Sequence, residues 1–174
     1  LDLTGEIQQE NARPAFQTIK LLTQQGWEIS ERNLKEGLDN VIPNTKLLGR
    51  FQVVNSSPTV VFDTAHNADG IKTLIKEINS LSYQKLHVVI GIASDKNQKE
   101  ILSLFPTETQ FYFCSSTNLR VLNGKELRSI AENINREGNS FKSVKKGLKS
   151  AESIADENDL ILVTGSNFVV ADVI

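Results

Sequence analysis

The chain has 174 residues, of which 39% are hydrophobic and 23% are charged, and its formal net charge is −2. These values are typical of a globular domain and lack the strong positive charge that a nucleic-acid or anionic-membrane partner would require. No uncharged run is long enough to cross a bilayer and no signal peptide is visible, so we expect a cytoplasmic protein without such partners. The single cysteine, Cys114, follows an apolar run, which favours a buried, reduced thiol.

Two helices are predicted before residue 45. Apolar residues recur at helical spacing from Glu10 to Gln25, where Pro14 fits only if it lies in the first turn. Ser30 is a favoured N-cap type for a second helix over Glu31–Asn40, although the Glu of a full capping box is missing. Pro43 then interrupts the pattern, and we place a domain boundary after residue 45.

Beyond residue 45 the pattern alternates between strands and helices. Apolar and β-branched runs predict strands at Phe51–Val54, Thr59–Phe62, Leu86–Ile90, Gln110–Phe113 and Leu160–Val163, and a short one near Phe141. Helical spacing predicts helices at Asn67–Leu81, Asn97–Leu104, Asn123–Asn135 and Val144–Asp156. This alternation favours an α/β fold with a Rossmann-like, mostly parallel sheet and helices on both faces.

Polar side chains follow the strand Thr59–Phe62 directly, where open α/β sheets bind ligands. The carboxylate of Asp63 could accept hydrogen bonds from ribose hydroxyls or could cap the next helix, and the residues alone do not decide between these roles. His66 could bind a ligand or be structural. The other histidine, His87, lies in an apolar strand and is expected to be structural. Neither histidine lies in a cluster with metal-ligand spacing, so we expect no metal site.

Two further strand ends carry side chains suited to an anionic ligand. Lys96 lies in the loop Gly91–Asn97, where its ammonium could pair with a carboxylate or be solvated. Ser166 lies in a strand–Gly–Ser turn, which offers a hydroxyl to an anion or is only a connection. The pattern Gly-x-Ser-x-Gly is absent, so Ser166 is predicted to bind a ligand and not to act as a nucleophile.

The sequence leaves the roles of two arginines undecided. Arg50, directly before the first predicted strand, could hold a phosphate through its planar guanidinium or could be a solvated surface residue. Arg120 precedes an apolar pair and has no assigned role, because a solvated or structural arginine explains it equally well.

Together these motifs resemble one family. Gly49-Arg50-Phe51, followed by a strand and then Asp63-Thr64-Ala65-His66-Asn67-Ala68, is similar to the entry of the Mur ligase C-terminal domain. Within that superfamily it most resembles folylpolyglutamate synthase / dihydrofolate synthase, which usually carries Asp-Gly-Ala-His-Asn-Pro. Thr64 and Ala68 depart from this pattern at positions whose side chains the chemistry does not require.

Other stretches extend the resemblance along the chain. The loop with Lys96, the turn Thr164-Gly165-Ser166 and the stretch around Arg120 are each similar to motifs of the folate ligases. Gly5-x-x-Gln8-x-x-Asn11 resembles the end of the central ATPase domain. The resemblance therefore implies that residues 1–45 are the C-terminal helices of that domain and that residues 46–174 are the glutamate-ligase domain.

The resemblance also implies roles for individual side chains. The amides of Gln8 and Asn11 would contact the adenine of ATP, and Asp63 would contact its ribose. Arg50 would bind the phosphates and is also the candidate catalytic residue, as a clamp on the transferred phosphoryl group. The residues expected to hold the incoming L-glutamate are His66, Lys96 and Ser166. The implied cofactors are ATP and Mg²⁺, the implied partners are L-glutamate and a folate or dihydropteroate, and the family habit is a monomer.

No Gly-x-x-x-x-Gly-Lys-[Ser/Thr] phosphate loop occurs in the sequence, and there is no methionine. We therefore expect a C-terminal fragment of an ATP-dependent ligase, inactive alone, whose phosphate loop and Mg²⁺ ligands lie upstream. The reaction implied by the resemblance is amide formation through an acyl phosphate. The alternatives are a peptidoglycan Mur ligase acting on a UDP-muramyl precursor and a non-catalytic Rossmann-like binding domain.

Overall fold

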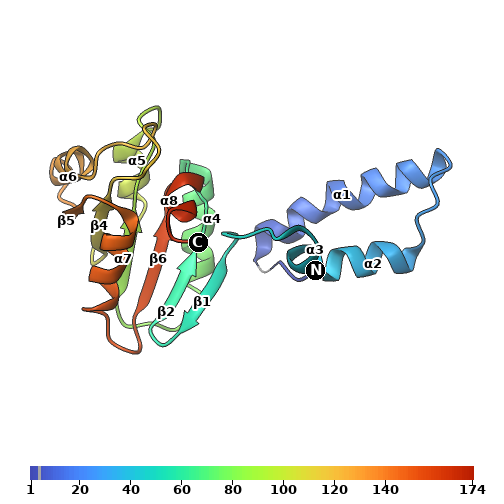
Figure 1. The fold of residues 1–174 in the computed structure, drawn as a ribbon, viewed down its shortest axis with the longest axis horizontal. Coiled ribbons are helices and arrows are strands. Elements are labelled where there is room, and N and C mark those ends of the chain that lie inside the picture. The colour runs from blue at the N-terminus through green and yellow to red at the C-terminus, as the bar shows by residue number, and fades with distance from the viewer. Residues whose placement is uncertain (4) are drawn as a thin grey trace. The chain divides into compact units, whose positions relative to one another are not determined.

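The computed structural model describes residues 1–3 and 5–174 and divides into two compact units, residues 1–51 and residues 52–174. The first unit is helical and the second is built on a six-stranded sheet (Figure 1). Each unit is described by itself below.

The helices of the first unit are α1 (Glu6–Gln24), α2 (Glu31–Asp39) and α3 (Val41–Thr45). The start of the first helix was predicted wrongly, because α1 begins at Glu6 and Pro14 lies in its interior. A proline there removes one backbone hydrogen bond, and the helix continues around it. The carbonyl of Pro14 accepts a hydrogen bond from the Thr18 hydroxyl at 2.8 Å. Four upstream residues, which the apolar pattern did not reveal, thus belong to the helix.

The N-terminus of α2 is capped more completely than the sequence predicts. The backbone N–H of Asn33 donates to Ser30 Oγ at 3.1 Å, and Asn33 Oδ1 accepts from the backbone N–H of Ser30 at 3.3 Å. Asn33 therefore takes the place of the Glu in a capping box, because its amide oxygen reaches the same donor. Pro43, which was taken to interrupt the helical pattern, lies in the first turn of the short helix α3, where proline is tolerated.

The second unit confirms the predicted α/β fold with a mostly parallel sheet. Its strand order is β1-β2-β6-β3-β4-β5. The strands are β1 (Gln52–Ser56), β2 (Thr59–Phe62), β3 (Leu86–Ile90), β4 (Gln110–Cys114), β5 (Gly138–Phe141) and β6 (Leu160–Thr164). The edge strand β1 is antiparallel to β2, and the other neighbouring pairs are parallel. In β3 and β6 each residue is buried, as their apolar runs require.

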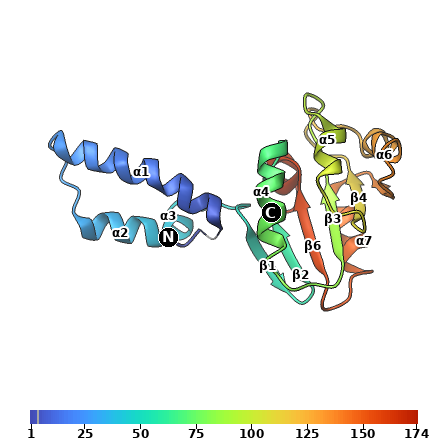
Figure 2. The same ribbon diagram turned by 180° about the vertical axis from the view of Figure 1, so that it is seen from behind.

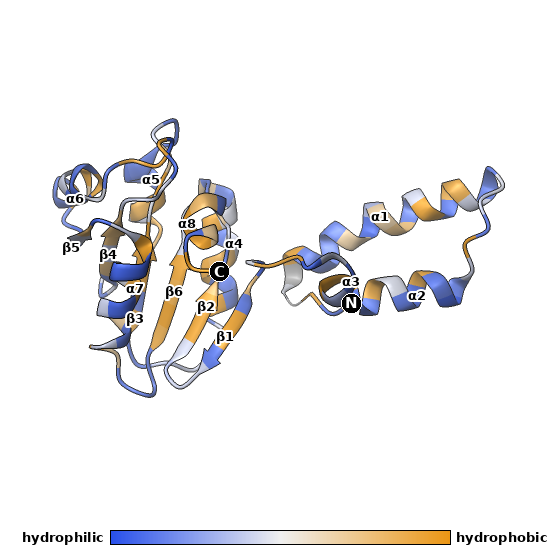
Figure 3. Ribbon diagram, in the orientation of Figure 1, coloured by the Kyte–Doolittle hydropathy of each residue, from blue (hydrophilic) through white to orange (hydrophobic). Residues whose placement is uncertain are grey.

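Helices cover both faces of this sheet. They are α4 (Ala68–Ile78), α5 (Gln98–Ser103), α6 (Gly124–Glu132), α7 (Val144–Glu152) and α8 (Asn167–Ala171). Helices α4, α5 and α6 lie on one face, and α7 and α8 lie on the other (Figures 1 and 2). Hydrophobic residues fill the strands and the helix sides that face them (Figure 3). The core therefore consists of two apolar layers, one on each side of the sheet.

The single cysteine lies in the layer beneath α7. Cys114 is fully buried, and burial raises the pKa of its thiol to about 12. Its thiol points to the carbonyl of Tyr112, and Gly147 of α7 leaves room for the sulfur. The predicted buried, reduced thiol is thus confirmed.

A buried polar network joins three strands near the amino ends of β3 and β6. His87 donates from Nε2 to Asp159 Oδ2 at 3.1 Å, because a carboxylate can only accept, and His87 Nδ1 lies 3.0 Å from the Tyr112 hydroxyl. Asp159 also accepts from the backbone N–H groups of Lys85 and Asp156. His87 is 3% exposed and is structural, as predicted. The network fixes the sheet at the end opposite the carboxyl ends of the strands.

Asp159→Asn should destabilise the protein by about 1–3 kcal/mol at neutral pH, because the amide leaves buried donors unpaired. Burial alone would raise the pKa of the Asp159 carboxyl, but hydrogen bonds from two backbone N–H groups and from His87 bring it below its ordinary value. The stabilisation is therefore present above the unfolded pKa of about 3.9 and is lost as the pH falls through the folded pKa. Urea unfolding at pH 7 and pH 3 measures the difference.

Asp156→Asn is the matched control, because its side chain is 69% exposed and pairs with Lys85 only at 3.6 Å. It should change stability by at most about 0.5 kcal/mol. A cost for Asp159→Asn that equals the control, or that is the same at both pH values, would contradict the role given to the network.

Candidate functional site

The strand order creates a hollow at the carboxyl ends of β2, β6 and β3. The chain leaves β2 and β3 toward the face covered by α4 and α5, but it leaves β6 toward the face covered by α8. Connections that diverge to opposite faces open a crevice above the sheet, and ligands of open α/β sheets bind there. The predicted site residues His66, Lys96 and Ser166 follow these three strands.

The segment after β2 is fixed by its own hydrogen bonds. Asp63 Oδ1 accepts from the backbone N–H of Ala65 at 2.8 Å, and His66 Nδ1 lies 3.1 Å from the carbonyl of Thr64. Because a carbonyl can only accept, Nδ1 carries the proton and Nε2 is left for a ligand. The N-cap of α4 is Asn67, so the alternative in which Asp63 caps this helix is wrong.

The end of β6 depends on a glycine. Gly165 has φ +99°, and a Cβ built there would lie 2.5 Å from the carbonyl oxygen of Gly91 at the end of the neighbouring strand. The next residue, Ser166, is 5% exposed, and its Oγ accepts from the backbone N–H of Phe168 at 3.2 Å. Among the described residues the Ser166 hydroxyl donates to no acceptor, so its proton is available to a ligand.

The loops after β3 and β4 are joined by backbone hydrogen bonds. Ser94 donates its N–H to the carbonyl of Arg120 at 2.8 Å, and Leu122 donates to the carbonyl of Ile92 at 2.9 Å, around an antiparallel bridge between Ala93 and Val121. These bonds hold the stretch that carries Arg120 beside the stretch that carries Lys96. Arg120 is thereby placed at the same hollow as the predicted residues.

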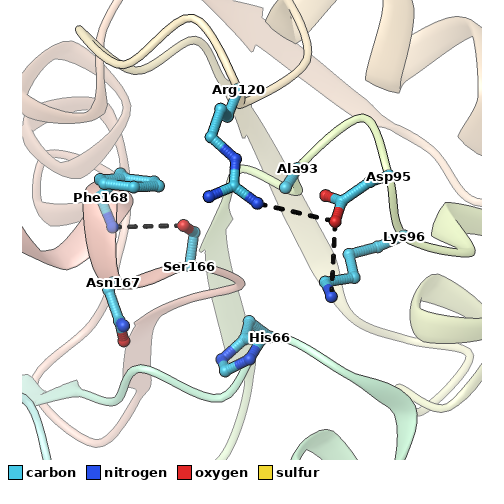
Figure 4. A pocket seen from close by; sticks show the side chains of 8 residues that line it. All are labelled: His66, Ala93, Asp95, Lys96, Arg120, Ser166, Asn167 and Phe168. Atoms are coloured by element: carbon cyan, nitrogen blue, oxygen red, sulfur yellow. Dashed lines mark hydrogen bonds and ion pairs between the residues drawn. The ribbon is translucent and has the colours of Figure 1, made fainter.

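The hollow has a volume of about 170 Å³. Its lining residues are His66, Ala93, Asp95, Lys96, Arg120, Ser166, Asn167 and Phe168 (Figure 4). Sites for drug-sized ligands measure about 300–1,000 Å³, so this pocket suits a small molecule such as an amino acid better than a nucleotide.

One carboxylate lies between the two cations of the pocket. Asp95 Oδ2 is 3.7 Å from Lys96 Nζ and 3.7 Å from the Arg120 guanidinium (Figure 4). Both distances exceed those of charge-assisted hydrogen bonds, so the cations are held loosely and remain free to turn to a ligand. The Lys96 side chain is 33% exposed and that of Arg120 is 67% exposed.

The structure thus brings His66, Lys96 and Ser166 into one pocket, while their role as glutamate ligands stays a prediction. Sequence reasoning noticed Arg120 but gave it no role, because its partner loop is distant in the chain. It missed Asp95, although this residue directly precedes Lys96 in the same motif. Phe168 was also missed, and no sequence signal distinguishes it from a core residue.

The predicted ATP-binding residues are not among those that line this pocket. Gln8 and Asn11 are neighbours on α1, where Asn11 Nδ2 lies 3.4 Å from Gln8 Oε1. Arg50 is exposed, between Gly49 with φ 73° and Phe51 with φ 46°, and belongs to the first unit. Asp63 is half-buried in the second unit. Their roles stay predictions.

Within residues 1–3 and 5–174, no three His, Cys, Asp or Glu side chains gather as a metal site would require. Over the same residues, each helix is too short or too polar to cross a lipid bilayer.

Residues 49–167 match the family described as Mur ligase, glutamate ligase domain, and the chain belongs to this family. It is 30% identical over 168 residues to the dihydrofolate synthase/folylpolyglutamate synthase of Escherichia coli K12. The matched region covers 96% of this chain and 37% of that protein. Two solved structures have the same fold over 88% of this chain and 36% of theirs. They are E. coli FolC in complex with DHPP and ADP (TM-score 0.73, 30% identity) and a bifunctional folylpolyglutamate synthase/dihydrofolate synthase with Mn, AMPPNP and L-glutamate bound (TM-score 0.72, 25% identity). The chain thus spans little more than a third of the length of these relatives.

Gly165→Ala should destabilise the protein by at least about 1–3 kcal/mol, because it combines a strained φ with a backbone collision at Gly91. Gly26→Ala is the matched control, since Gly26 has φ +95° but no atom within 4 Å of a built Cβ. Urea unfolding of both variants should give the larger loss for Gly165→Ala. An equal or smaller loss would contradict the close approach of the two strand ends.

Proposed function

We propose that residues 1–174 form the C-terminal part of an ATP-dependent ligase that adds L-glutamate to dihydropteroate or to folyl-glutamates. The observation that carries this proposal is the small pocket that joins His66, Lys96 and Ser166. Two cations and a buried hydroxyl suit carboxylates, and the pocket volume suits an amino acid. A relative with the same fold has L-glutamate bound, which supports the same ligand here.

The amide pair on α1 supports ATP as the second substrate. Asn11 donates to Gln8 Oε1, and within the described part of the chain the Gln8 amide N–H groups and Asn11 Oδ1 make no other hydrogen bond. The pair therefore offers one donor and one acceptor, which is what the edge of an adenine requires. Asp63 would accept from the ribose hydroxyls, and Arg50 would stabilise the charge that develops on the transferred phosphoryl group. Relatives with ADP or AMPPNP bound support this assignment.

Residues 1–45 are proposed to be the last helices of the ATP-binding domain, and residues 46–174 the glutamate-ligase domain. In the first unit α2 and α3 bury no residue, and the side chains of Phe16 and Trp27 are at least half exposed. Such apolar surface is expected where further parts of a domain pack. The phosphate loop and the ligands of Mg²⁺ are assigned to the part of the ligase outside these residues, because the sequence contains no phosphate loop and the chain spans only 37% of the E. coli relative.

In the proposed reaction the carboxylate of the folate substrate accepts the γ-phosphoryl group of ATP, which releases ADP and forms an acyl phosphate. The ammonium group of L-glutamate first gives one proton to water, and the free amine nitrogen then attacks the acyl carbon. A C–N bond forms, phosphate leaves with the C–O electron pair, and the second proton of the nitrogen passes to the leaving phosphate. The role of the pocket is to hold the amine in place for this attack. Positioning of this kind contributes through lost translational freedom and not through a covalent intermediate with the protein.

ADP release by the full-length protein tests the proposal. Release with dihydropteroate plus L-glutamate, and none with UDP-muramyl substrates, is expected for the folate ligase. Release of ADP only with a UDP-muramyl substrate would instead indicate a peptidoglycan Mur ligase. No ADP release with either substrate would favour a non-catalytic binding domain. Residues 1–174 alone should release no ADP, because they contain no phosphate loop.

Lys96→Ala and Ser166→Ala should each raise the KM for L-glutamate about 10- to 100-fold, with a smaller effect on kcat, because each removes a hydrogen bond to a charged group. Steady-state kinetics of the full-length variants measures this effect. Lys99→Ala, an exposed lysine on α5 outside the pocket, is the matched control and should leave KM unchanged. An unchanged KM in both pocket variants would contradict the assignment of the glutamate site.

A further inference from the structure

The charges of the pocket match those of an acidic amino acid. Among the lining residues Lys96 and Arg120 are cations and Asp95 is an anion. An acidic amino acid at neutral pH carries two carboxylates and one ammonium. Each charge of the ligand can therefore meet one opposite charge of the pocket, whereas a neutral amino acid would leave one cation unpaired.

The carboxylate of Asp95 is not held in place by close contacts with the rest of the described structure. Its side chain is 52% exposed, and among the described residues its carboxylate contacts Lys96 and Arg120 through long ion pairs of Oδ2. The fold of its loop is held instead by the backbone bonds to Arg120 and Leu122 and by Gln98, whose amide donates to the carbonyls of Ala93 and Ser94. The acid can therefore turn away from the cations without disturbing the loop.

We propose that Asp95 binds the ammonium group of the incoming acidic amino acid while Lys96 and Arg120 bind its carboxylates. This inference rests on the proposed function, because it takes the pocket to be the amino-acid site. Without a ligand, Asp95 lies between the two cations. When carboxylates occupy the cations, the acid is released from them and meets the remaining positive charge of the ligand. Ser166 donates its hydroxyl proton to one of the two carboxylates.

Asp95 thus fixes the position of the ligand's amine within the pocket. In the proposed reaction the amine is the nucleophile, so its orientation matters for the attack. Among the lining side chains, the other groups that could accept from an ammonium include His66 Nε2 and the amide oxygen of Asn167. A carboxylate is preferred for this role because a hydrogen bond between two charged groups is stronger than one with a neutral acceptor.

Binding of two matched ligands to the full-length protein tests this role. L-glutamate and glutarate share both carboxylates, but glutarate lacks the amine. By isothermal titration the wild-type protein should bind L-glutamate about 10- to 100-fold more tightly than glutarate, as one hydrogen bond between charged groups implies. In Asp95→Asn this ratio should fall to near one, because L-glutamate loses the partner of its ammonium group. Asp95→Glu, which keeps the charge, should retain part of the ratio.

The controls separate the possible failures. Glu108→Gln removes an exposed carboxylate before β4, outside the pocket, and should keep the wild-type ratio. Asp95→Asn binding both ligands more weakly by the same factor would overturn the proposal in favour of a structural role. If Asp95→Asn binds both ligands more tightly, the proposal is overturned, because Asp95 then only competes with the ligand for the two cations. An unchanged ratio would overturn it and point to another acceptor of the pocket. If the wild-type protein binds neither ligand, the proposed amino-acid site itself fails.

Discussion

The insertion of β6 between β2 and β3 is the constraint on which the site depends. The strand β6 lies between β2 and β3 in the sheet, and the chain leaves it toward the face opposite to the one taken by the connections after β2 and β3. The chain achieves this by a turn at Gly165 that passes close to the carbonyl of Gly91. A side chain at residue 165 would push the two strand ends apart and move Ser166 out of the pocket.

Backbone bonds, and not ion pairs, hold the loops of the pocket in place. The stretch with Arg120 is held by hydrogen bonds to Ser94 and Ile92, and the end of β6 is held by the bond from the N–H of Gly165 to the carbonyl of Ala65. The charged side chains extend from this frame with loose contacts of 3.7 Å. Such an arrangement fixes where the charges originate while it leaves their tips free to close on a small anionic ligand.

The sequence allowed the fold and three of the eight pocket residues to be predicted, for identifiable reasons. Apolar runs such as Leu86–Ile90 reveal buried strands, and polar residues at strand ends point to one edge of the sheet. Arg120 could not be placed, because its position depends on backbone pairing with Ser94, which no local pattern encodes. The start of α1 was missed because Pro14 was taken as a mark of the first turn.

A structure of the full-length protein with L-glutamate and a non-hydrolysable ATP analogue tests the central claim most directly. The account predicts L-glutamate in the hollow above β6, with one carboxylate within hydrogen-bond distance of Ser166 Oγ and the other facing the cations Lys96 and Arg120. The nucleotide should lie outside this hollow. A nucleotide phosphate bound at Ser166 and Lys96, or L-glutamate bound elsewhere, would contradict the account.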